Sequence, residues 1–279
     1  MTGLTKWARE IAAWQTYMTA RKLRVATIDL RVYHVTRFSR EVGGTPESLT
    51  FDGLTAWVAG KPWLPNTARA YRASLRSFYS WALATGRVTH SPPHLWLPPN
   101  VPRALPRPTP EAVYRIALRA TDPRVRLAVR LGGACGLRRG EIAKAKREHV
   151  QDDLAGHCLW VRGKGGHERL VPLPDEIARE ILRMPAGYLF PSSHGRHLTP
   201  AHLGKLVASE LQAIEARLDS KLTTHTLRHR AGTRAYDQTK DLRAVQELLG
   251  HSKPETTAIY TQVSRAAVRA AMMGAADGL

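Results

Sequence analysis

The part of the sequence that decides the fold runs from residue 224 to residue 260. It contains Thr224-His225-Thr226-Leu227-Arg228-His229, then, further along the chain, Leu249-Gly250-His251, and finally Tyr260. Histidines and an arginine supply cationic and proton-transferring groups, and a tyrosine hydroxyl becomes a nucleophile when a base removes its proton. In this order they predict a site that binds a phosphate group and attacks it with a side chain. The rest of the chain then has to carry this site and bind the substrate that bears the phosphate.

The charge of the chain indicates a polyanionic partner. Its 279 residues include 42 Lys and Arg against 23 Asp and Glu, so the formal net charge is +19 and the pI is about 10.6. Ten of these cations are lysines and 32 are arginines, and the planar guanidinium suits bidentate contacts with phosphate. A GC-rich genome, which favours Arg and Ala codons, is the alternative explanation for part of this bias. Because the cations run through the whole chain, nucleic acid is favoured over a membrane surface.

Length and composition indicate a cytosolic protein of two domains. No apolar run approaches the roughly 20 residues that span a membrane, and residues 1–10 lack the pattern of a signal peptide. The two cysteines, Cys135 and Cys158, make no disulfide framework. We therefore expect a reducing environment and no membrane association. The expected location is the bacterial cytosol and nucleoid, or a host cell if the gene belongs to a phage.

Residues 1–90 are predicted to form a helical domain. Apolar residues recur at helical spacing from Trp7 to Met18. A second helix is predicted to start near Thr27, and a third, shorter one covers residues 49–58.

The fourth predicted helix of this domain has the clearest pattern. Asn66 is its expected N-cap, it ends before Gly86, and one of its faces is apolar. The opposite face carries Arg69, Arg72 and Arg76. A solvated face is the simpler interpretation, but in a chain this basic an arginine stripe opposite an apolar stripe indicates a helix that lies along DNA.

Residues 91–109 are predicted to be a proline-rich interdomain linker. Eight of the 18 prolines fall between Ser91 and Pro110, namely Pro92, Pro93, Pro98, Pro99, Pro102, Pro106, Pro108 and Pro110. Since proline lacks a backbone N–H, we expect an extended, semi-rigid segment without a helix. Arg103 and Arg107 are then expected to contact the phosphate backbone. A disordered spacer is the alternative.

Residues 110–279 are predicted to form the catalytic domain. Its first helix is expected to have Thr109 as N-cap and Pro110 at the first helical position. A second helix starts at Asp122-Pro123 and runs to about residue 134, and a later one covers residues 201–217. Residues 182–200 are expected to be connection.

Two further stretches of this domain carry charged residues at glycine-bearing turns. One reads Gly136-Leu137-Arg138-Arg139-Gly140-Glu141 and places an arginine at the mouth of a helix, with an acid three residues later. The other reads Arg162-Gly163-Lys164-Gly165-Gly166-His167-Glu168-Arg169 and lies between the apolar segments 158–161 and 170–173. It predicts a β-hairpin with a basic, glycine-rich tip. Such a tip either binds phosphate passively or carries its lysine into a site and out again.

Together these stretches resemble the active-site pattern of the tyrosine recombinases, or phage integrases. The pattern comprises Arg138 in Gly-Leu-Arg-Arg-Gly-Glu, Lys164 in Gly-Lys-Gly-Gly, His225-x-x-Arg228, His251 after Leu-Gly, and Tyr260. Each piece alone is weak, whereas all five in order between residues 110 and 265 are specific. The resemblance implies a mainly α fold with a small β-hairpin sheet, in which a helical core-type DNA-binding domain precedes an α+β catalytic domain.

These residues also fit the chemistry of phosphodiester cleavage. The reaction needs a nucleophile, groups that neutralise the phosphorane, and a proton for the leaving oxygen. Tyr260 is the expected nucleophile, and the resemblance implies a 3′-phosphotyrosyl bond that stores the bond energy without ATP. Arg138 and Arg228 are expected to hold the non-bridging oxygens, where charge develops. Lys164 is expected to protonate the departing 5′-oxygen.

The remaining residues of the predicted site assist these groups. His225 is expected to transfer a proton to or from the tyrosine, and His251 to donate a hydrogen bond to the phosphate. Glu141 is expected to orient the arginines from behind, and Arg139 to contact the DNA backbone. No metal or other cofactor is expected, because the cations are side chains, and a zinc site built on Cys158 has the wrong ligand spacing.

The resemblance implies how such a protein works on DNA. Double-stranded attachment or core-type sites are the expected substrate, cut by a homotetramer with accessory DNA-bending or directionality factors of host or phage. A short helix over residues 264–273 is expected to dock on a neighbouring protomer, with an intramolecular end-helix as the alternative. The N-terminal domain that many phage integrases use on arm-type sites is expected to be absent.

Departures from the family pattern are few. His167 stands where many relatives carry a second lysine, and Arg230 stands where a small residue is common. Neither change removes a catalytic group. His229 is expected to be structural.

The predicted function is site-specific DNA recombination, with the integration or excision of a temperate phage or mobile element as its purpose. Three alternatives stay open. A Xer-like recombinase shares all of the chemistry, and a type IB topoisomerase shares the nucleophile but needs no site. A DNA-binding protein that lost its activity is the third, and the complete set of catalytic residues argues against it.

Overall fold

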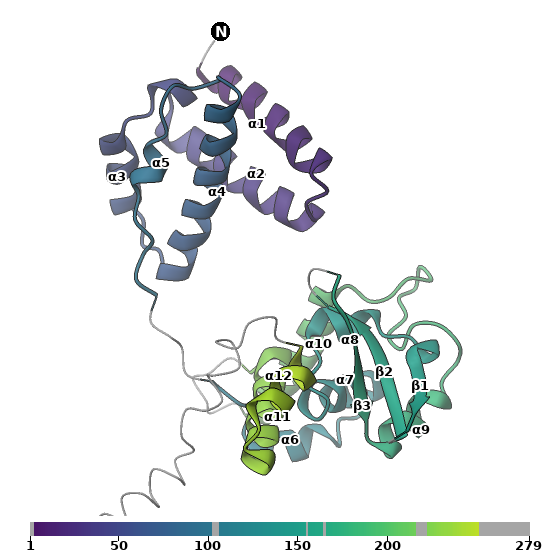
Figure 1. Cartoon of the computed structure of the whole chain (residues 1–279). Coiled ribbons are helices and arrows are strands. Elements are labelled where there is room, and N and C mark those ends of the chain that lie inside the picture. The colour runs from purple at the N-terminus through teal and green to yellow at the C-terminus, as the bar shows by residue number, and fades with distance from the viewer. Residues whose placement is uncertain (1–2, 102–105, 155, 164–165, 216–221, 251–279) are drawn as a thin grey trace, which may run out of the picture. The chain divides into compact units, whose positions relative to one another are not determined.

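The computed structural model describes residues 3–101, 106–154, 156–163, 166–215 and 222–250. The chain divides into two compact units, residues 1–103 and 104–279. Helices dominate both units, and a three-stranded antiparallel sheet lies in the second (Figure 1). The prediction of a mainly α fold with a small sheet is confirmed. Within the described residues, no helix is both long and apolar enough to cross a membrane.

The first unit is built from helices joined by short turns. Its elements are α1 (Gly3–Ala20), α2 (Val25–Val42), the 3-10 helix η1 (Pro46–Ser48), α3 (Phe51–Ala59), α4 (Pro65–Ala84) and α5 (Pro92–Leu95). Its core is aromatic: the ring of Trp7 lies 5.8 Å from Phe38 of α2 and 5.5 Å from Phe78 of α4. The apolar periodicity of the first helix therefore marks the face that is buried.

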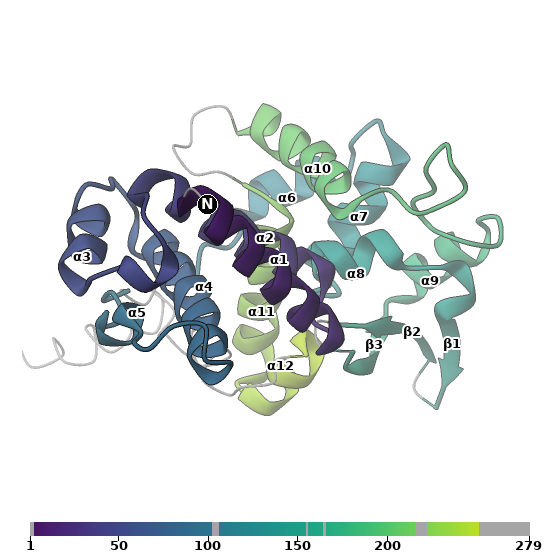
Figure 2. The same ribbon diagram turned by 90° about the horizontal axis from the view of Figure 1, so that it is seen from above.

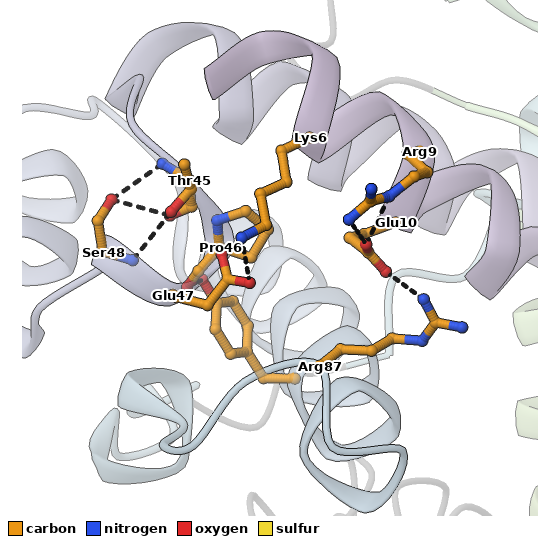
Figure 3. Close-up of polar contacts among 9 residues, drawn as sticks. Lys6, Arg9, Glu10, Thr45, Pro46, Glu47, Ser48 and Arg87 are labelled. Carbon is orange, nitrogen blue, oxygen red and sulfur yellow. Dashed lines mark hydrogen bonds and ion pairs between the residues drawn. The ribbon is translucent and has the colours of Figure 1, made fainter. Parts of the chain in front are cut away.

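Ion pairs join α1 to two turns of the same unit (Figure 3). The carboxylate of Glu10 is buried and accepts hydrogen bonds from Arg9 and, at 2.6 Å, from Arg87 just after α4. Lys6, one turn earlier, pairs with Glu47 of η1 at 2.7 Å. These contacts fix α1 to the turn at η1 and to the turn that follows α4.

Two predictions for this unit are wrong, one about the start of a helix and one about the absence of a helix. α4 begins at Pro65, with Leu64 before it, so Asn66 lies inside the helix and is not its N-cap. The proline-rich segment was expected to contain no helix, but it contains α5. Pro92 and Pro93 occupy its first two positions, where a helix needs no backbone N–H and the fixed φ of proline is favourable.

The second unit surrounds α7 and the sheet. Its elements are α6 (Glu111–Ala117), α7 (Pro123–Gly133), α8 (Arg139–Lys144), the 3-10 helix η2 (Arg147–His149), β1 (Val150–Asp153), β2 (Gly156–Arg162), β3 (Glu168–Leu173), α9 (Asp175–Leu182), α10 (Pro200–Ile214), α11 (Thr224–Thr239) and α12 (Leu242–Leu249). Large side chains of this core that are fully buried include Leu131, Leu137, Ile142 and Phe190.

The strands run in the order β1-β2-β3, and Val161 of β2 pairs with Arg169 of β3. The hairpin of β2 and β3 was predicted, whereas the polar strand β1 and the helix α9, which packs against β1 and β2, were not (Figure 2). In both views β3 is the strand nearest to α12. This edge of the sheet therefore faces the segment that leads to His251.

One predicted helix start is confirmed and one is wrong. Asp122 caps α7 by accepting a hydrogen bond from the N–H of Arg124 at 2.8 Å. Thr109 does not cap α6, which begins at Glu111 after Pro110. The hydroxyl of Thr109 is instead 2.8 Å from that of Thr226, so this side chain joins the start of the unit to α11.

Arg230, the departure from the family pattern, ties α11 to two other helices. Its guanidinium forms a two-point ion pair with Glu111 of α6 and donates to the carbonyl of Gly133 at the end of α7. It also lies 3.5 Å from the centroid of the Tyr114 ring. The large side chain is accommodated here because Glu111, Gly133 and the Tyr114 ring all contact its guanidinium.

We expect Arg230→Met to lower the free energy of unfolding by about 1–3 kcal/mol, since it removes three hydrogen bonds and a cation–π contact. Urea denaturation of the purified chain measures the change. Arg234→Met, on the exposed side of the same helix, is the control and should change the stability by less than about 0.5 kcal/mol. Equal effects of the two variants would contradict the structural role of Arg230.

Candidate active site

Arg138 stands at the mouth of α8, as the glycine-bearing turn predicted. Its backbone N–H donates to Oε2 of Glu141 and its Nη1 donates to Oε1, both at 2.9 Å. Its Nη2 donates to the carbonyl of Gly250 at 2.9 Å. A carboxylate at the start of the helix and a carbonyl at the end of α12 therefore hold this guanidinium from two sides.

Arg228 projects from the first turns of α11 and is almost completely buried, at 3% exposure. Its two terminal nitrogens donate to the carbonyls of Gly136 and Leu249, at 2.6 Å and 2.5 Å. These carbonyls belong to the turn before Arg138 and to the last residue of α12. The two arginines are 90 positions apart in sequence, and both reach the turn at residues 249–250.

Glu141 carries its negative charge in the interior. Its side chain is 3% exposed, and besides Arg138 it binds both terminal nitrogens of Arg169 on β3, each at 2.9 Å. Burial by itself would raise the pKa of this carboxyl, but the hydrogen bonds and charges of the two arginines lower it to about 2. The carboxylate therefore stays ionised at any pH near neutrality.

His225 and His229 lie one turn apart on α11, with their rings edge to face and their centroids 4.4 Å apart. Partial burial, together with the charges of Arg228 and Arg138, lowers the pKa of His225. Burial, His225 and Arg228 lower the pKa of His229 to about 4. Both rings are therefore neutral at pH 7, and a neutral His225 is able to accept a proton.

Three predicted catalytic residues, Lys164, His251 and Tyr260, lie outside the described residues. Their neighbours in the chain are described. A β-carbon on Gly163 would lie 3.1 Å from Oε1 of Glu141, so the neck of the hairpin passes directly over this carboxylate. Gly250 accepts the hydrogen bond from Arg138. The roles of the three residues stay predictions.

A groove of about 1200 Å³ opens beside these groups. The hairpin forms one wall, with His167 and Arg169, and α12 forms the other, with Arg243 and Leu248. Arg138 also lines the groove. Among the described residues, no three His, Cys, Asp or Glu side chains are placed to hold a metal ion. The cationic groups next to the groove are guanidinium groups, which suit the oxygens of a phosphate.

The residues predicted to bind DNA differ in what surrounds them. Arg69 and Arg107 are exposed and Arg103 lies outside the described residues. Arg72 donates to the carbonyl of Trp96, and Arg76 donates to that of His94, so both hold the segment around α5. Contact of any of these with DNA stays a prediction.

Arg139 lies across α10. A β-carbon on Gly204 of that helix would lie 2.6 Å from Cδ of Arg139, so the glycine leaves the space that this side chain occupies. The residue is exposed. Its predicted contact with the DNA backbone is untested.

Arg169 is a residue of the site that was not predicted from the sequence, where it is only the last residue of a basic hairpin tip. The signal that would have found it is the alternation of β3, in which Arg169 shares the inward face with Val171 and Leu173. A cation on the buried face of a strand needs a buried anion. Glu141 is that anion.

Comparison with known proteins gives relatives over most of the chain. A family model described as the phage integrase family matches residues 110–266. The tyrosine recombinase XerD of Pseudomonas putida is 32% identical over 229 residues, which cover 76% of each chain. XerD of Listeria monocytogenes serotype 4b is 31% identical over 273 residues, covering 89% of this chain and 90% of that protein.

A solved structure shows the same fold. The dimer of lambda integrase residues 75–356 bound to a COC′ core site has a TM-score of 0.74 at 18% sequence identity. The match covers 91% of this chain and 94% of that chain.

The low pKa of Glu141 predicts a specific dependence of stability on pH. A carboxyl whose folded pKa is about 2 stabilises the fold above its ordinary value of 4.5, and the contribution disappears as pH falls toward 2. We therefore expect Glu141→Gln to be less stable than the unmodified chain at pH 6, by roughly 3 kcal/mol. The difference should shrink steadily between pH 4.5 and pH 2.

Urea denaturation at a series of pH values measures this difference. Glu168→Gln, which removes an exposed carboxylate of the neighbouring hairpin, is the control for the loss of a negative charge. A difference between Glu141→Gln and the unmodified chain that stays constant from pH 6 to pH 2 would show that the carboxylate is not held by the arginines.

Proposed function

Because the chain belongs to the phage integrase family and is a site-specific DNA recombinase of the tyrosine type, we propose that it cuts and rejoins DNA through a covalent bond to Tyr260. The observation that carries this proposal is the convergence of Arg138 and Arg228 on the turn at residues 249–250. That turn directly precedes His251 in the sequence. The two arginines that are predicted to bind the phosphate therefore lie beside the residue that precedes His251, in the part of the sequence that also contains Tyr260.

In the proposed cleavage step, the phenolic oxygen of Tyr260 attacks the scissile phosphorus and the bond between phosphorus and the 5′-oxygen breaks. The phenolic proton passes to neutral His225, and Lys164 gives a proton to the departing 5′-oxygen. Arg138, Arg228 and His251 bind the non-bridging oxygens while the phosphorane forms. Rejoining is the reverse, with the 5′-hydroxyl of another strand attacking the 3′-phosphotyrosyl bond.

Double-stranded DNA is the partner that the charge supports. With a net charge of +19, the chain attracts the phosphate backbone at long range. We propose that the first unit and the catalytic unit bind one DNA site, with Arg69, Arg107 and Arg139 on the backbone. Four such protomers are needed to exchange two pairs of strands, so the active assembly is a homotetramer on DNA.

Two biological roles share this chemistry. One is integration or excision of a phage or mobile element, in which the recombination site lies beside the gene. The other is resolution of chromosome or plasmid multimers, and it is favoured by the XerD relatives, which match up to 90% of their own length. The location of the DNA site distinguishes the two.

We expect a covalent protein–DNA adduct on a single site. Nicked duplexes tiled across the DNA that flanks the gene, and duplexes from chromosomal sites of multimer resolution, are incubated with the protein. Denaturation in detergent then reveals a slowly migrating adduct, because the nick traps the phosphotyrosyl intermediate. Tyr260→Phe, which keeps the ring and removes the hydroxyl, should abolish it.

Each outcome has a clear meaning. An adduct beside the gene supports the role in integration, and an adduct at a multimer-resolution site supports the Xer-like role. Adducts on every duplex would indicate a topoisomerase. Tight binding without any adduct on any duplex would contradict cleavage.

DNA affinity should depend steeply on salt. Each neutralised phosphate contributes a loss of about 0.9 log units of affinity per log unit of salt concentration. We expect the slope to become smaller by about one unit in Arg139→Met, as measured by fluorescence anisotropy in the Tyr260→Phe background. A flat salt response of the parent protein would be incompatible with binding through the phosphate backbone.

A further inference from the structure

Arg169 lies where a strand normally carries an apolar residue. Along β3 the side chains alternate in burial, and Arg169 points inward together with Val171 and Leu173. Its side chain is 15% exposed. A guanidinium keeps its charge at any physiological pH, so in this place it requires a fixed anionic partner.

That partner is Glu141, which Arg169 holds with two parallel hydrogen bonds of 2.9 Å. Oε1 of Glu141 accepts at the same time from Nη1 of Arg138. The carboxylate that orients Arg138 is therefore itself held by Arg169. Without Arg169, the carboxylate would lose two of its four hydrogen bonds among the described residues and would be held by Arg138 alone.

Arg169 also packs against the turn after α12. A β-carbon on Gly250 would lie 2.8 Å from Cδ and Nε of Arg169 and 2.9 Å from its Cζ, so the arginine passes directly over the glycine backbone. The carbonyl of the same residue accepts a hydrogen bond from Arg138. Gly250 is thus held between two arginines that share one carboxylate.

We infer that Arg169 is a positioning residue for strand cleavage, which fixes Arg138 through Glu141 and supports the turn that leads to His251. The inference rests on the proposed function. Direct binding of DNA explains the residue less well, because its side chain is 15% exposed against 33% for Arg138 and its Nε is buried. Its guanidinium is also held by Glu141 in a two-point contact. Its effect is therefore expected on the rate of the chemical step and not on DNA affinity.

The test uses the full chain and the nicked duplex on which the adduct forms. We expect Arg169→Met to slow single-turnover adduct formation at saturating DNA by roughly 10- to 100-fold, because small displacements of catalytic groups have effects of this size. The dissociation constant of the DNA, measured in the Tyr260→Phe background, should change by less than about twofold. Arg169→Lys keeps one charged donor and should recover part of the rate.

Arg179→Met is the control, since it removes an exposed arginine on α9, outside the hairpin that carries Lys164. It should leave the rate at saturating DNA unchanged. Thermal denaturation of each variant shows whether it is folded.

A second variant tests the inference without removing any charged group. In Gly250→Ala the new methyl group collides with Arg169, so cleavage should again slow by roughly tenfold or more, with DNA affinity retained. Gly195→Ala controls for the backbone strain, because Gly195 also has a positive φ, +70°, but has open space around it. It should cleave at the normal rate.

The outcomes separate the two proposals. If the unmodified chain forms no adduct that depends on Tyr260, the proposed function fails and the inference with it. The inference is overturned, while the function stands, if the unmodified chain cleaves and the folded variants Arg169→Met and Gly250→Ala cleave as fast as it does. A loss of rate that is matched by an equal loss of DNA affinity would also overturn it.

Discussion

The buried carboxylate of Glu141 is the constraint on which the catalytic unit depends. Removing a carboxylate from water is unfavourable unless cations and N–H groups replace the water. Glu141 receives Arg138 from its own helix and Arg169 from β3. Because Arg138 also binds the carbonyl at the end of α12, one buried charge joins a helix start, a sheet edge and a helix end. The low pKa of Glu141 shows that this pairing outweighs the burial.

The same pairing leaves the site positive. Glu141 is shared by two guanidinium groups, and a third, Arg228, is satisfied by backbone carbonyls, which carry only partial negative charge. The neighbouring histidines are neutral because burial and, after it, the nearby positive charges lower their pKa. In the proposed reaction, a phosphodiester would therefore meet an excess of fixed cations together with an uncharged His225, and these are the conditions that phosphate binding and proton transfer require.

The sequence predicted those features whose causes are local. The helix start at Asp122-Pro123, the glycine-rich hairpin and the position of Arg138 one turn before Glu141 each depend on residues a few positions apart. Features with distant causes were missed. Thr109 does not cap its helix because it bonds Thr226, and Arg169 is informative only when Glu141 is known to be beside it. For Lys164, His251 and Tyr260, motif order remains the evidence.

Two glycines explain why the motifs of this site contain the small residues they do. Gly136 and Gly250 both have positive φ, which glycine adopts without strain. A β-carbon on Gly136 would lie 2.7 Å from the side chain of Leu249, and one on Gly250 would collide with Arg169. The turn at Gly136 and the turn at residues 249–250 therefore pack together, with Leu249 against Gly136. Arg228 donates a hydrogen bond to a carbonyl of each turn. Gly136-Leu137-Arg138 and Leu249-Gly250 are consequently two halves of one structural unit, and a substitution in either glycine should disturb both Arg138 and Arg228.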